Sequence, residues 1–380
     1  MDVTFDHVGD ATHVPLPAER AGTLTERFGV LHRQMLKMLP EIDQVSWVLY
    51  DADSGMLRSF VDSSEAGVPL RRYEFPLAES PSLSRLVANR TARILDDIPV
   101  QTPGPSVHAT HIRTAGFRSS YTVPLFDGEL FQGILFFNSM SPGAFTPDTV
   151  SRLDVHVRLL HMLVTQELTA ARALVGSVRV ARDFARLRDN DTGSHLDRIS
   201  RYARLIARHI SPRHKVSDEF VELVFLFAAM HDIGKVGIPD AILHKPTELT
   251  REEREDMARH VDLGMQIIDR LIEEFHLGSL AGIDVLRNIV GSHHEFLDGS
   301  GYPKGLRGDQ IPLEARIVTV ADIFDALSSD RPYKPAWTLE QALEALANLA
   351  DTGKIDPECV AALHAERESV ADIMARYGER

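Results

Sequence analysis

The sequence predicts an α+β N-terminal domain, built on an antiparallel sheet with helices, that a long helix joins to an all-α helical bundle. Three observations predict this architecture. Strand-like segments occur in pairs, and only before residue 145. After residue 145, apolar residues recur at spacings of three and four, as in a long helix. The rest of the chain, up to the C-terminus, has helical periodicity throughout. The 380 residues, of which 44% are hydrophobic, are enough for two domains with a core each.

The N-terminal region is predicted to pair its strands in hairpins. Residues 1–20 have no periodic signal and are expected to form a loose arm. Within residues 21–150, a helix is expected from Leu24 to Leu39. The segment QVSWVLYDADSGMLRSFVD predicts two strands with a turn ending at Gly55, and SSYTVPLFDGELFQGILFF predicts two more around Gly128. A short helix, SLSRLVANR, separates the two pairs.

This order of elements resembles a GAF domain: a leading helix, a strand pair, a small helix, a strand pair and a trailing helix. The resemblance covers residues 21–150 and implies a sensor domain. It depends on element order and on no diagnostic motif. Three roles therefore stay open, namely binding a small ligand, binding a nucleotide, or serving only as a dimer scaffold, and we assign no ligand.

A long helix is predicted over residues 146–188, and residues 151–188 are taken as the linker. Its apolar positions form a coiled-coil-like stripe with one slip in register near Val164. Such a stripe can pack within its own chain or on a second copy. Because it continues past the end of one domain, we favour a homodimer formed through the GAF-like domain and this helix. The stripe consists of Leu153, Val157, Leu160, Val164, Leu168, Ala171, Val175 and Val178.

Composition excludes several classes of function. A formal net charge of −14 argues against binding nucleic-acid backbones. The longest apolar run, from Phe220 to Met230, contains Glu222 and is too short to cross a membrane. The single cysteine, Cys359, excludes an intramolecular disulfide and a cysteine-built metal site. The acidic start MDVTFDHVGD lacks the basic residues of a secretory signal, so we expect a cytoplasmic protein with no membrane or nucleic-acid partner.

Residues 189–380 are predicted to be all helical, with Thr250 and Glu253 as a capping box. Eight histidines and aspartates here are candidate metal ligands. They lie on or at the ends of helices, and Asp322 is expected to begin its helix. A single such residue is more often solvated or hydrogen-bonded, so the order of the whole set carries the prediction. With no thiolate, the set suits iron, manganese or another first-row divalent ion. The candidates are Asp191, His195, His231, Asp232, His260, His293, His294 and Asp322.

Three sequence segments in the C-terminal region resemble a second known family. HDIGK at 231–235, HHEFLDGSGYP at 293–303 and VADIFDALSSDRPYK at 320–334 are similar to the HD-GYP family, a branch of the HD-domain phosphohydrolases. The resemblance covers roughly residues 180–370. It implies two divalent metal ions, iron first and manganese as the alternative, held by the candidate set with Asp232 linking both. Asp191 stands where some members carry a longer glutamate for a third metal, so a third site stays open.

The same resemblance implies the reaction. Members of the family linearise cyclic di-GMP to pGpG, and many continue to GMP, in bacterial second-messenger signalling. Asp232 and Lys235 match catalytic positions, because Lys235 should place an ammonium beside the phosphate. Lys235, Tyr302, Arg331 and Lys334 match positions that contact substrate.

Three other functions are alternatives to this reaction. A cyclic dinucleotide receptor with little turnover is disfavoured, because degenerate members lose part of the motif and every core position is filled here. A phosphodiesterase for another cyclic dinucleotide, such as cyclic GMP-AMP, stays open. An HD phosphohydrolase acting on some other nucleotide is disfavoured by the GYP loop. The linker helix is expected to transmit regulation from the GAF-like domain, with a passive tether as the alternative.

Overall fold

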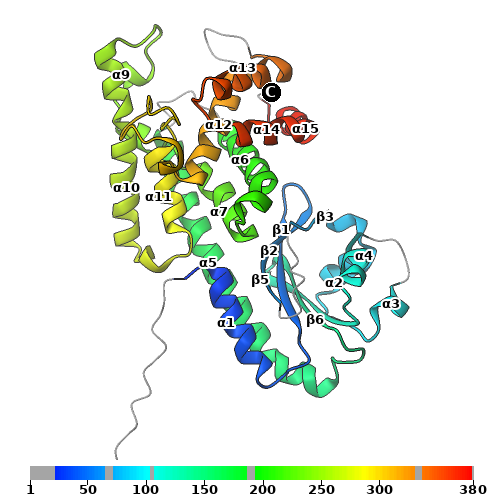
Figure 1. Cartoon of the computed structure of the whole chain (residues 1–380). Helices are drawn as coiled ribbons and strands as arrows, with labels where there is room; N and C mark the ends of the chain where they lie inside the picture. Colours follow the sequence, from blue (N-terminus) through cyan, green and yellow to red (C-terminus); the bar gives the residue numbers. More distant parts are fainter. Residues whose placement is uncertain (1–21, 65–71, 103–106, 186–192, 330–335, 379–380) are drawn as a thin grey trace, which may run out of the picture.

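The structure is a computed structural model that describes residues 22–64, 72–102, 107–185, 193–329 and 336–378 (Figure 1). The predicted architecture is confirmed. An antiparallel sheet with helices forms the N-terminal part, and the described C-terminal part is helical (Figure 1). One long helix runs from the first part into the second.

The sheet has six strands in the order β3-β2-β1-β6-β5-β4, all antiparallel. Both predicted hairpins are present, and β1 pairs with β6 to join them at the centre. The short edge strands β3 and β4 were not predicted, because three residues are too few to show a period of two. The strands are β1 (Gln44–Asp51), β2 (Met56–Ser64), β3 (Glu74–Pro76), β4 (Arg93–Leu95), β5 (Ser119–Asp127) and β6 (Leu130–Ser139).

Helices cover both faces of this sheet (Figure 1). On one face, α1 (Leu24–Leu36) packs beside α5 (Pro147–Ala185), and on the other lie α2 (Pro81–Asn89), α3 (Ile98–Gln101) and α4 (Val107–Thr114). Side chains alternate between the two faces, as the strand period requires. Trp47 belongs to the core under α1 and α5, whereas its neighbour Val48 belongs to the opposite core.

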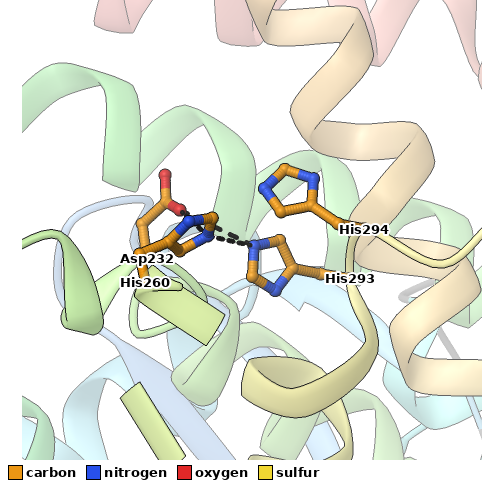
Figure 2. Close-up of side chains that lie close together, drawn as sticks. All are labelled: Asp232, His260, His293 and His294. Atoms are coloured by element: carbon orange, nitrogen blue, oxygen red, sulfur yellow. Dashed lines mark hydrogen bonds and ion pairs between the residues drawn. The ribbon is translucent and has the colours of Figure 1, made fainter. Parts of the chain in front are cut away.

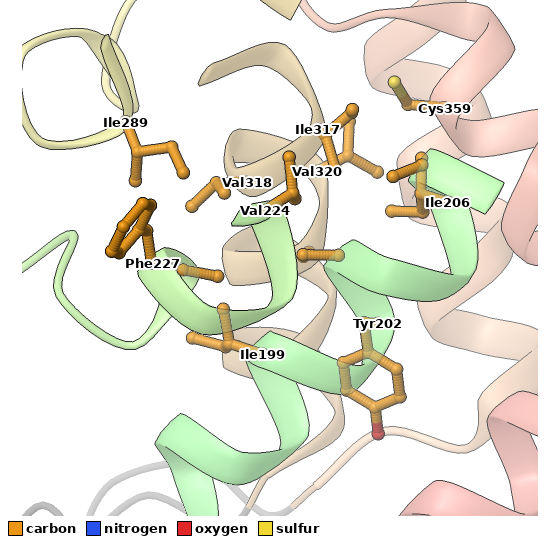
Figure 3. Packing of buried hydrophobic residues seen from close by; sticks show 14 of the residues in the cluster. Ile199, Tyr202, Ile206, Val224, Phe227, Ile289, Ile317, Val318, Val320 and Cys359 are labelled. Atoms are coloured by element: carbon orange, nitrogen blue, oxygen red, sulfur yellow. The ribbon is translucent and has the colours of Figure 1, made fainter. Parts of the chain in front are cut away.

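The C-terminal part is a bundle around one large core (Figure 3). Ile199, Phe227, Ile289 and Val318 bring four helices together there, and each is fully buried. The capping box at Thr250 and Glu253 is confirmed. The helices are α6 (Gly193–His214), α7 (Asp218–Ala228), α8 (Asp240–Leu243), α9 (Arg251–Ala258), α10 (His260–Glu274), α11 (Ile283–Ser292), α12 (Leu313–Ser328), α13 (Leu339–Asp351), α14 (Pro357–Ala365) and α15 (Arg367–Tyr377).

One boundary differs from the prediction. The sequence predicts a helix that begins at Asp322, whereas Asp322 lies well inside α12, which begins at Leu313. The residues before it are rich in β-branched side chains, which have weak helix propensity. Ile317, Val318 and Val320 are all fully buried in the bundle core, so tertiary packing stabilises the helix where propensity does not.

The long helix α5 belongs to both cores. Leu160, Val164 and Leu168 pack in the core beneath the sheet, whereas Ala171 and Val175 pack in the core of the bundle. The predicted apolar stripe is therefore covered within its own chain in this structure. The side chain of Val178 lies outside the described residues, and the homodimer stays a prediction. Neither α5 nor another described helix is long and apolar enough to cross a membrane.

A buried carboxylate fixes the two parts to each other. Glu219, in the first turn of α7, accepts hydrogen bonds from the backbone N–H of Leu24 (2.7 Å) and from the N–H and hydroxyl of Thr25 (2.8 and 2.6 Å). We call these three bonds the Glu219 clamp. Beside it, Asp218 accepts hydrogen bonds from the Ser59 hydroxyl (2.5 Å) and the Arg72 N–H (2.9 Å). The first turn of α7 is thus held by α1 and β2.

Candidate metal centre

Predicted ligands from five elements converge in two adjacent groups. Within each group, one potential ligand atom per residue lies within 4.8 Å of every other. Figure 2 shows the first group, which gathers from the end of α7, the start of α10 and the end of α11. The first group is Asp232, His260, His293 and His294, and the second is His195, His231 and Asp322.

Asp232 connects the two groups through its two carboxylate oxygens. Oδ1 lies 3.2 Å from Nε2 of His260 and 3.6 Å from Nε2 of His293 (Figure 2). Oδ2 lies 3.1 Å from Nε2 of His231, which belongs to the second group. A carboxylate with one oxygen facing each group is placed to bridge two ions.

Backbone carbonyls orient three of the histidine rings. Nδ1 of His231 lies 2.8 Å from the carbonyl of Ala228, and Nδ1 of His260 lies 2.8 Å from that of Met257. Nδ1 of His293 lies 3.1 Å from the carbonyl of Ile289. Since a carbonyl can only accept, each Nδ1 carries the proton and donates it. In a neutral ring of this kind the unprotonated Nε2 faces the centre, which is the arrangement found for histidines that bind metals.

The centre is short of hydrogen-bond donors. His231 Nε2 and Asp232 Oδ1 are buried and have no hydrogen-bond partner in the part of the chain that the structure describes. Buried polar atoms without partners are uncommon and call for an unseen partner such as an ion or water. Nitrogen and carboxylate donors without a thiolate suit first-row divalent metals. The residues present therefore fit a pair of such ions.

Electrostatics keeps three of the ligands in the protonation state that metal binding needs. Burial opposes charge on Asp232, but Lys235, with Nζ 2.6 Å from Oδ2, and His231 hold the pKa of Asp232 well below its usual range. Burial lowers the pKa of His293 and, together with the neighbouring His293, that of His294. Burial would also lower the pKa of His231, but the Asp232 carboxylate raises it. Asp232 is thus ionised, and His293 and His294 are neutral.

A second carboxylate orients His195. Asp325 is fully buried, and its Oδ2 lies 2.6 Å from His195 Nδ1. Arg198 donates to both oxygens of Asp325, at 2.6 and 3.0 Å. Although burial would raise the pKa of Asp325, these hydrogen bonds lower it. Sequence reasoning missed Asp325 and Arg198, although Asp325 follows Asp322 by one helical turn and so shares its face.

The glycine after the HD pair is required by close packing. A Cβ on Gly234 would lie 1.8 Å from the carbonyl oxygen of His260 and 2.4 Å from the nitrogen of Gly264. The 3₁₀ turn Ile233–Gly237 therefore rests directly on α10. This contact sets the positions of Asp232 and His260 relative to each other.

The GYP loop folds back over His294. A Cβ on Gly301 would lie 2.5 Å from the His294 carbonyl, and the Tyr302 N–H donates to that carbonyl at 3.0 Å. The Tyr302 ring covers the His294 ring, with 4.7 Å between centroids. Glu295, which is buried, accepts hydrogen bonds from the N–H of Lys304 (2.7 Å) and of Leu306 (2.9 Å). Glu295 is part of the motif, but its role in shaping the loop was not predicted from the sequence.

Three predicted site residues lie outside the described residues: Asp191, Arg331 and Lys334. The side chain of Lys235 is described, and it lies against Asp232 with 29% of its surface exposed. It is within reach of a ligand at the centre.

Comparison with known proteins finds matches for the C-terminal region. Residues 180–359 match the family model for the HD domain. A cyclic di-GMP phosphodiesterase response regulator of Xanthomonas campestris is 43% identical over 50% of this chain and 47% of its own. A 3'3'-cGAMP-specific phosphodiesterase of Vibrio cholerae is 38% identical over 46% of this chain and 31% of its own. The chain thus spans about half or less of the length of these curated relatives.

The N-terminal part is similar in fold to solved structures of low sequence identity. A GAF domain from a cyanobacterial phytochrome, solved with phycocyanobilin, aligns over 38% of this chain and 92% of its own, with 19% identity and a TM-score of 0.29. The strand order and the placement of the helices define the N-terminal fold by themselves.

Proposed function

Because residues 180–359 match the family model for the HD domain, we propose that the protein is a metal-dependent phosphodiesterase that hydrolyses cyclic di-GMP. The observation that carries the proposal is the position of Asp232, with one oxygen toward each group of candidate ligands. Two divalent ions, when bound, supply charge neutralisation and an activated water for phosphodiester cleavage. The name of the Xanthomonas relative supports the substrate.

In this proposal the chain's own side chains hold and tune the ions. The Nε2 atoms bind because Nδ1 is protonated, and Asp325 acts through His195 as an orienting group. Iron is the first choice of metal and manganese the second, with Asp191 as the ligand for a third ion. The proposed ligands are Asp191, His195, His231, Asp232, His260, His293, His294 and Asp322.

Substrate contacts are assigned to the groups around the centre. Lys235 presents its ammonium beside Asp232 and would neutralise a phosphate oxygen. Tyr302 would line the cleft from its place over His294. Arg331 and Lys334 would contact phosphate or guanine. The products would be pGpG and then GMP.

Cyclic GMP-AMP is the second candidate substrate. It is favoured by the Vibrio relative that is named as specific for it. A receptor without turnover is less favoured, because all four members of the first group are present and gathered around one point. The two substrates differ in one base, so base contacts decide between them.

Turnover with defined metals tests the proposal. Full-length protein, purified without oxygen or chelator, should hold at least two iron or manganese ions per chain by elemental analysis. It should convert cyclic di-GMP to pGpG faster than it converts cyclic GMP-AMP, measured by chromatography. Chelation should stop both reactions, and iron or manganese should restore them. One metal or fewer per chain with no gain on reconstitution would overturn the metal assignment, and faster turnover of cyclic GMP-AMP would reassign the substrate.

We further propose that residues 21–150 form a regulatory GAF-like domain, which residues 151–188 couple to the catalytic residues 189–380. An apolar stripe remains exposed on the outer face of α5: Val155, Leu159 and Met162 are 59%, 39% and 61% exposed. These positions share one helical face, so a second copy could cover them and form the predicted homodimer. The single cysteine supports a cytoplasmic location.

A further inference from the structure

A cavity of about 230 Å³ lies between the two halves of the chain. Its walls come from the β2–β3 side of the sheet and from α6, α7 and α15 (Figure 1). It shares no lining residue with the candidate metal centre. It is therefore a separate feature of the interface.

The cavity is rich in arginine although the chain is acidic. Against a formal net charge of −14 for the whole chain, six arginines and four carboxylates line it. Among these carboxylates, Glu74 already pairs with Arg58 and Arg208, and Asp218 accepts the hydrogen bonds from Ser59 and Arg72 described above. The lining arginines are Arg58, Arg72, Arg201, Arg204, Arg208 and Arg376.

Arg204 is buried without an adequate acceptor. Only 9% of it is exposed. Its ion-pair distances to Asp51 and Glu222 are 3.6 and 3.7 Å, beyond good hydrogen-bond length. One face of its guanidinium stacks on Phe225 at 4.1 Å, and burial lowers its pKa. The two ion pairs balance the charge of Arg204, but they are too long for its N–H groups to form good hydrogen bonds with these carboxylates.

Arg201, one helical turn earlier on α6, is in a similar condition. It is 7% exposed, and its Nε is buried with no hydrogen-bond partner among the described residues. Its terminal nitrogen donates to Asp53 at 3.2 Å, and Asp53 is itself 76% exposed. Its guanidinium packs over the ring of Tyr377 at 4.1 Å. The two neighbouring guanidiniums thus have donor capacity left, because Nε of Arg201 has no hydrogen-bond partner among the described residues and Arg204 holds its two carboxylates only at 3.6 and 3.7 Å.

We propose that this interdomain cavity binds a small phosphate-bearing anion, either inorganic phosphate or a phosphate monoester. Guanidinium forks match the oxygens of phosphate, which accepts several hydrogen bonds at once. The cavity is smaller than the roughly 300–1,000 Å³ of sites for drug-sized ligands, which argues against a cyclic dinucleotide. A bound anion would contact both halves and stabilise their docked arrangement. This inference does not depend on the proposed phosphodiesterase activity.

Calorimetric titration of the full-length chain tests it. The protein is first treated with chelator and desalted, so that phosphate binding at metals cannot contribute. The ligands are inorganic phosphate, GMP, guanosine and cyclic di-GMP at constant ionic strength. Arg204→Gln removes the buried charge, Arg376→Gln changes the exposed rim, and Arg85→Gln on exposed α2 is the matched control.

The expected result is one saturable site per chain for phosphate or GMP, with no binding of guanosine. Arg204→Gln should weaken affinity at least tenfold and Arg376→Gln about threefold, whereas Arg85→Gln should leave it unchanged. If Arg204→Gln does not fold by circular dichroism, Arg376→Gln decides. Tighter binding of GMP than phosphate identifies a monoester, and equal binding identifies phosphate itself. Absence of saturable binding, or wild-type affinity in folded Arg204→Gln or Arg376→Gln protein, overturns the proposal.

Discussion

Asp232 lies between three histidine nitrogens and the ammonium of Lys235, so its removal affects both groups of candidate ligands. Asp232→Ala should lower cyclic di-GMP turnover by at least about a hundredfold and reduce metal content, because loss of a ligand or of its orienting contacts typically costs ten- to a hundredfold or more. Elemental analysis and single-turnover rates measure the two effects.

Asp262→Ala serves as the control for Asp232→Ala, since Asp262 is exposed on α10, two residues after His260. It should keep both metal and activity. Circular dichroism should show both variants folded. Near-normal turnover in folded Asp232→Ala protein would contradict the two-metal assignment.

Gly234 offers a purely steric test of the centre. Gly234→Ala places a methyl group 1.8 Å from the His260 carbonyl, so the 3₁₀ turn must move away from α10. We expect a loss of stability of about 1–3 kcal/mol, typical of overpacking, together with weaker metal binding. Denaturant melts and metal titration measure these effects.

The matched control for Gly234→Ala is Gly176→Ala. A Cβ at Gly176 meets nothing within 4 Å, and the residue lies inside α5. Alanine there should be neutral or stabilise the protein by about 0.5–1 kcal/mol. If the two variants behaved alike, the contact between the turn and α10 would not set the geometry of the centre.

The order of the residue types, with the family resemblance that it carries, selected eight candidate ligands, and the structure brings seven of them into two groups. The supporting residues were harder to find. Asp325 and Glu295 act through hydrogen bonds to His195 and to the backbone of Lys304 and Leu306. Such partners depend on how helices are placed in space, which no local spacing encodes.

At the scale of the element, the slip in the apolar stripe of α5 has a structural meaning. Val164 and Leu168 lie on either side of the slip, and the change from the sheet core to the bundle core follows between Leu168 and Ala171. An extra residue in the spacing turns the apolar face by part of a turn. The sequence predicted the stripe correctly. That the stripe packs against its own chain could not be predicted, because packing on a second copy would bury the same residues.

The strands show the same difference between local structure, which the sequence predicts, and long-range packing, which it does not. Strong alternation and turn residues at Gly55 and Gly128 located β1, β2, β5 and β6. The central pairing of β1 with β6 joins residues about ninety positions apart, and only the shared core determines it. Long-range pairing of this kind leaves no local signal in a single sequence.

The Glu219 clamp predicts how strongly α1 and α7 are coupled. Glu219→Ala leaves the N–H groups of Leu24 and Thr25 without their acceptor, which should cost on the order of 2–4 kcal/mol. Hydrogen exchange at these amides should accelerate, and denaturant melts should show the lower stability.

Glu252→Ala is the control for the clamp variant, because Glu252 is exposed in the first turn of α9 and should change stability by less than about 0.5 kcal/mol. Equal exchange rates at Leu24 and Thr25 in the wild type and in Glu219→Ala would show that the clamp contributes nothing to the interface.

At the scale of the whole molecule, α5 and α7 both connect the sheet to the metal centre. α5 enters both cores, and α7 begins at the Glu219 clamp and ends just before His231 and Asp232. A rigid element with two packing states can carry a change between sites. The proposed regulation of turnover by the N-terminal half would pass through these helices.

Insertions of one to four residues between Thr169 and Ala170 test this coupling. Each added residue turns the following part of α5 by about 100°. Turnover by folded, metal-loaded protein should vary with the number inserted, and the four-residue insertion, which nearly restores the phase, should depart least from the wild type. Equal turnover in all four variants would show that α5 is a passive tether.

The Glu219 clamp also bears on how such a chain could arise by recombination. A catalytic half that keeps a buried glutamate for the backbone of a particular neighbour is not freely exchangeable, because a new neighbour must supply donors at the same place. In homologous catalytic halves fused to unrelated N-terminal modules, the position of Glu219 should have lost its acidic residue, together with the partners of Asp218. Where both acidic residues are kept, the N-terminal module should contain partners equivalent to the start of α1 and to the Ser59 hydroxyl of β2. Inheritance of the two halves would then be linked at these few positions while the rest of each half diverged independently.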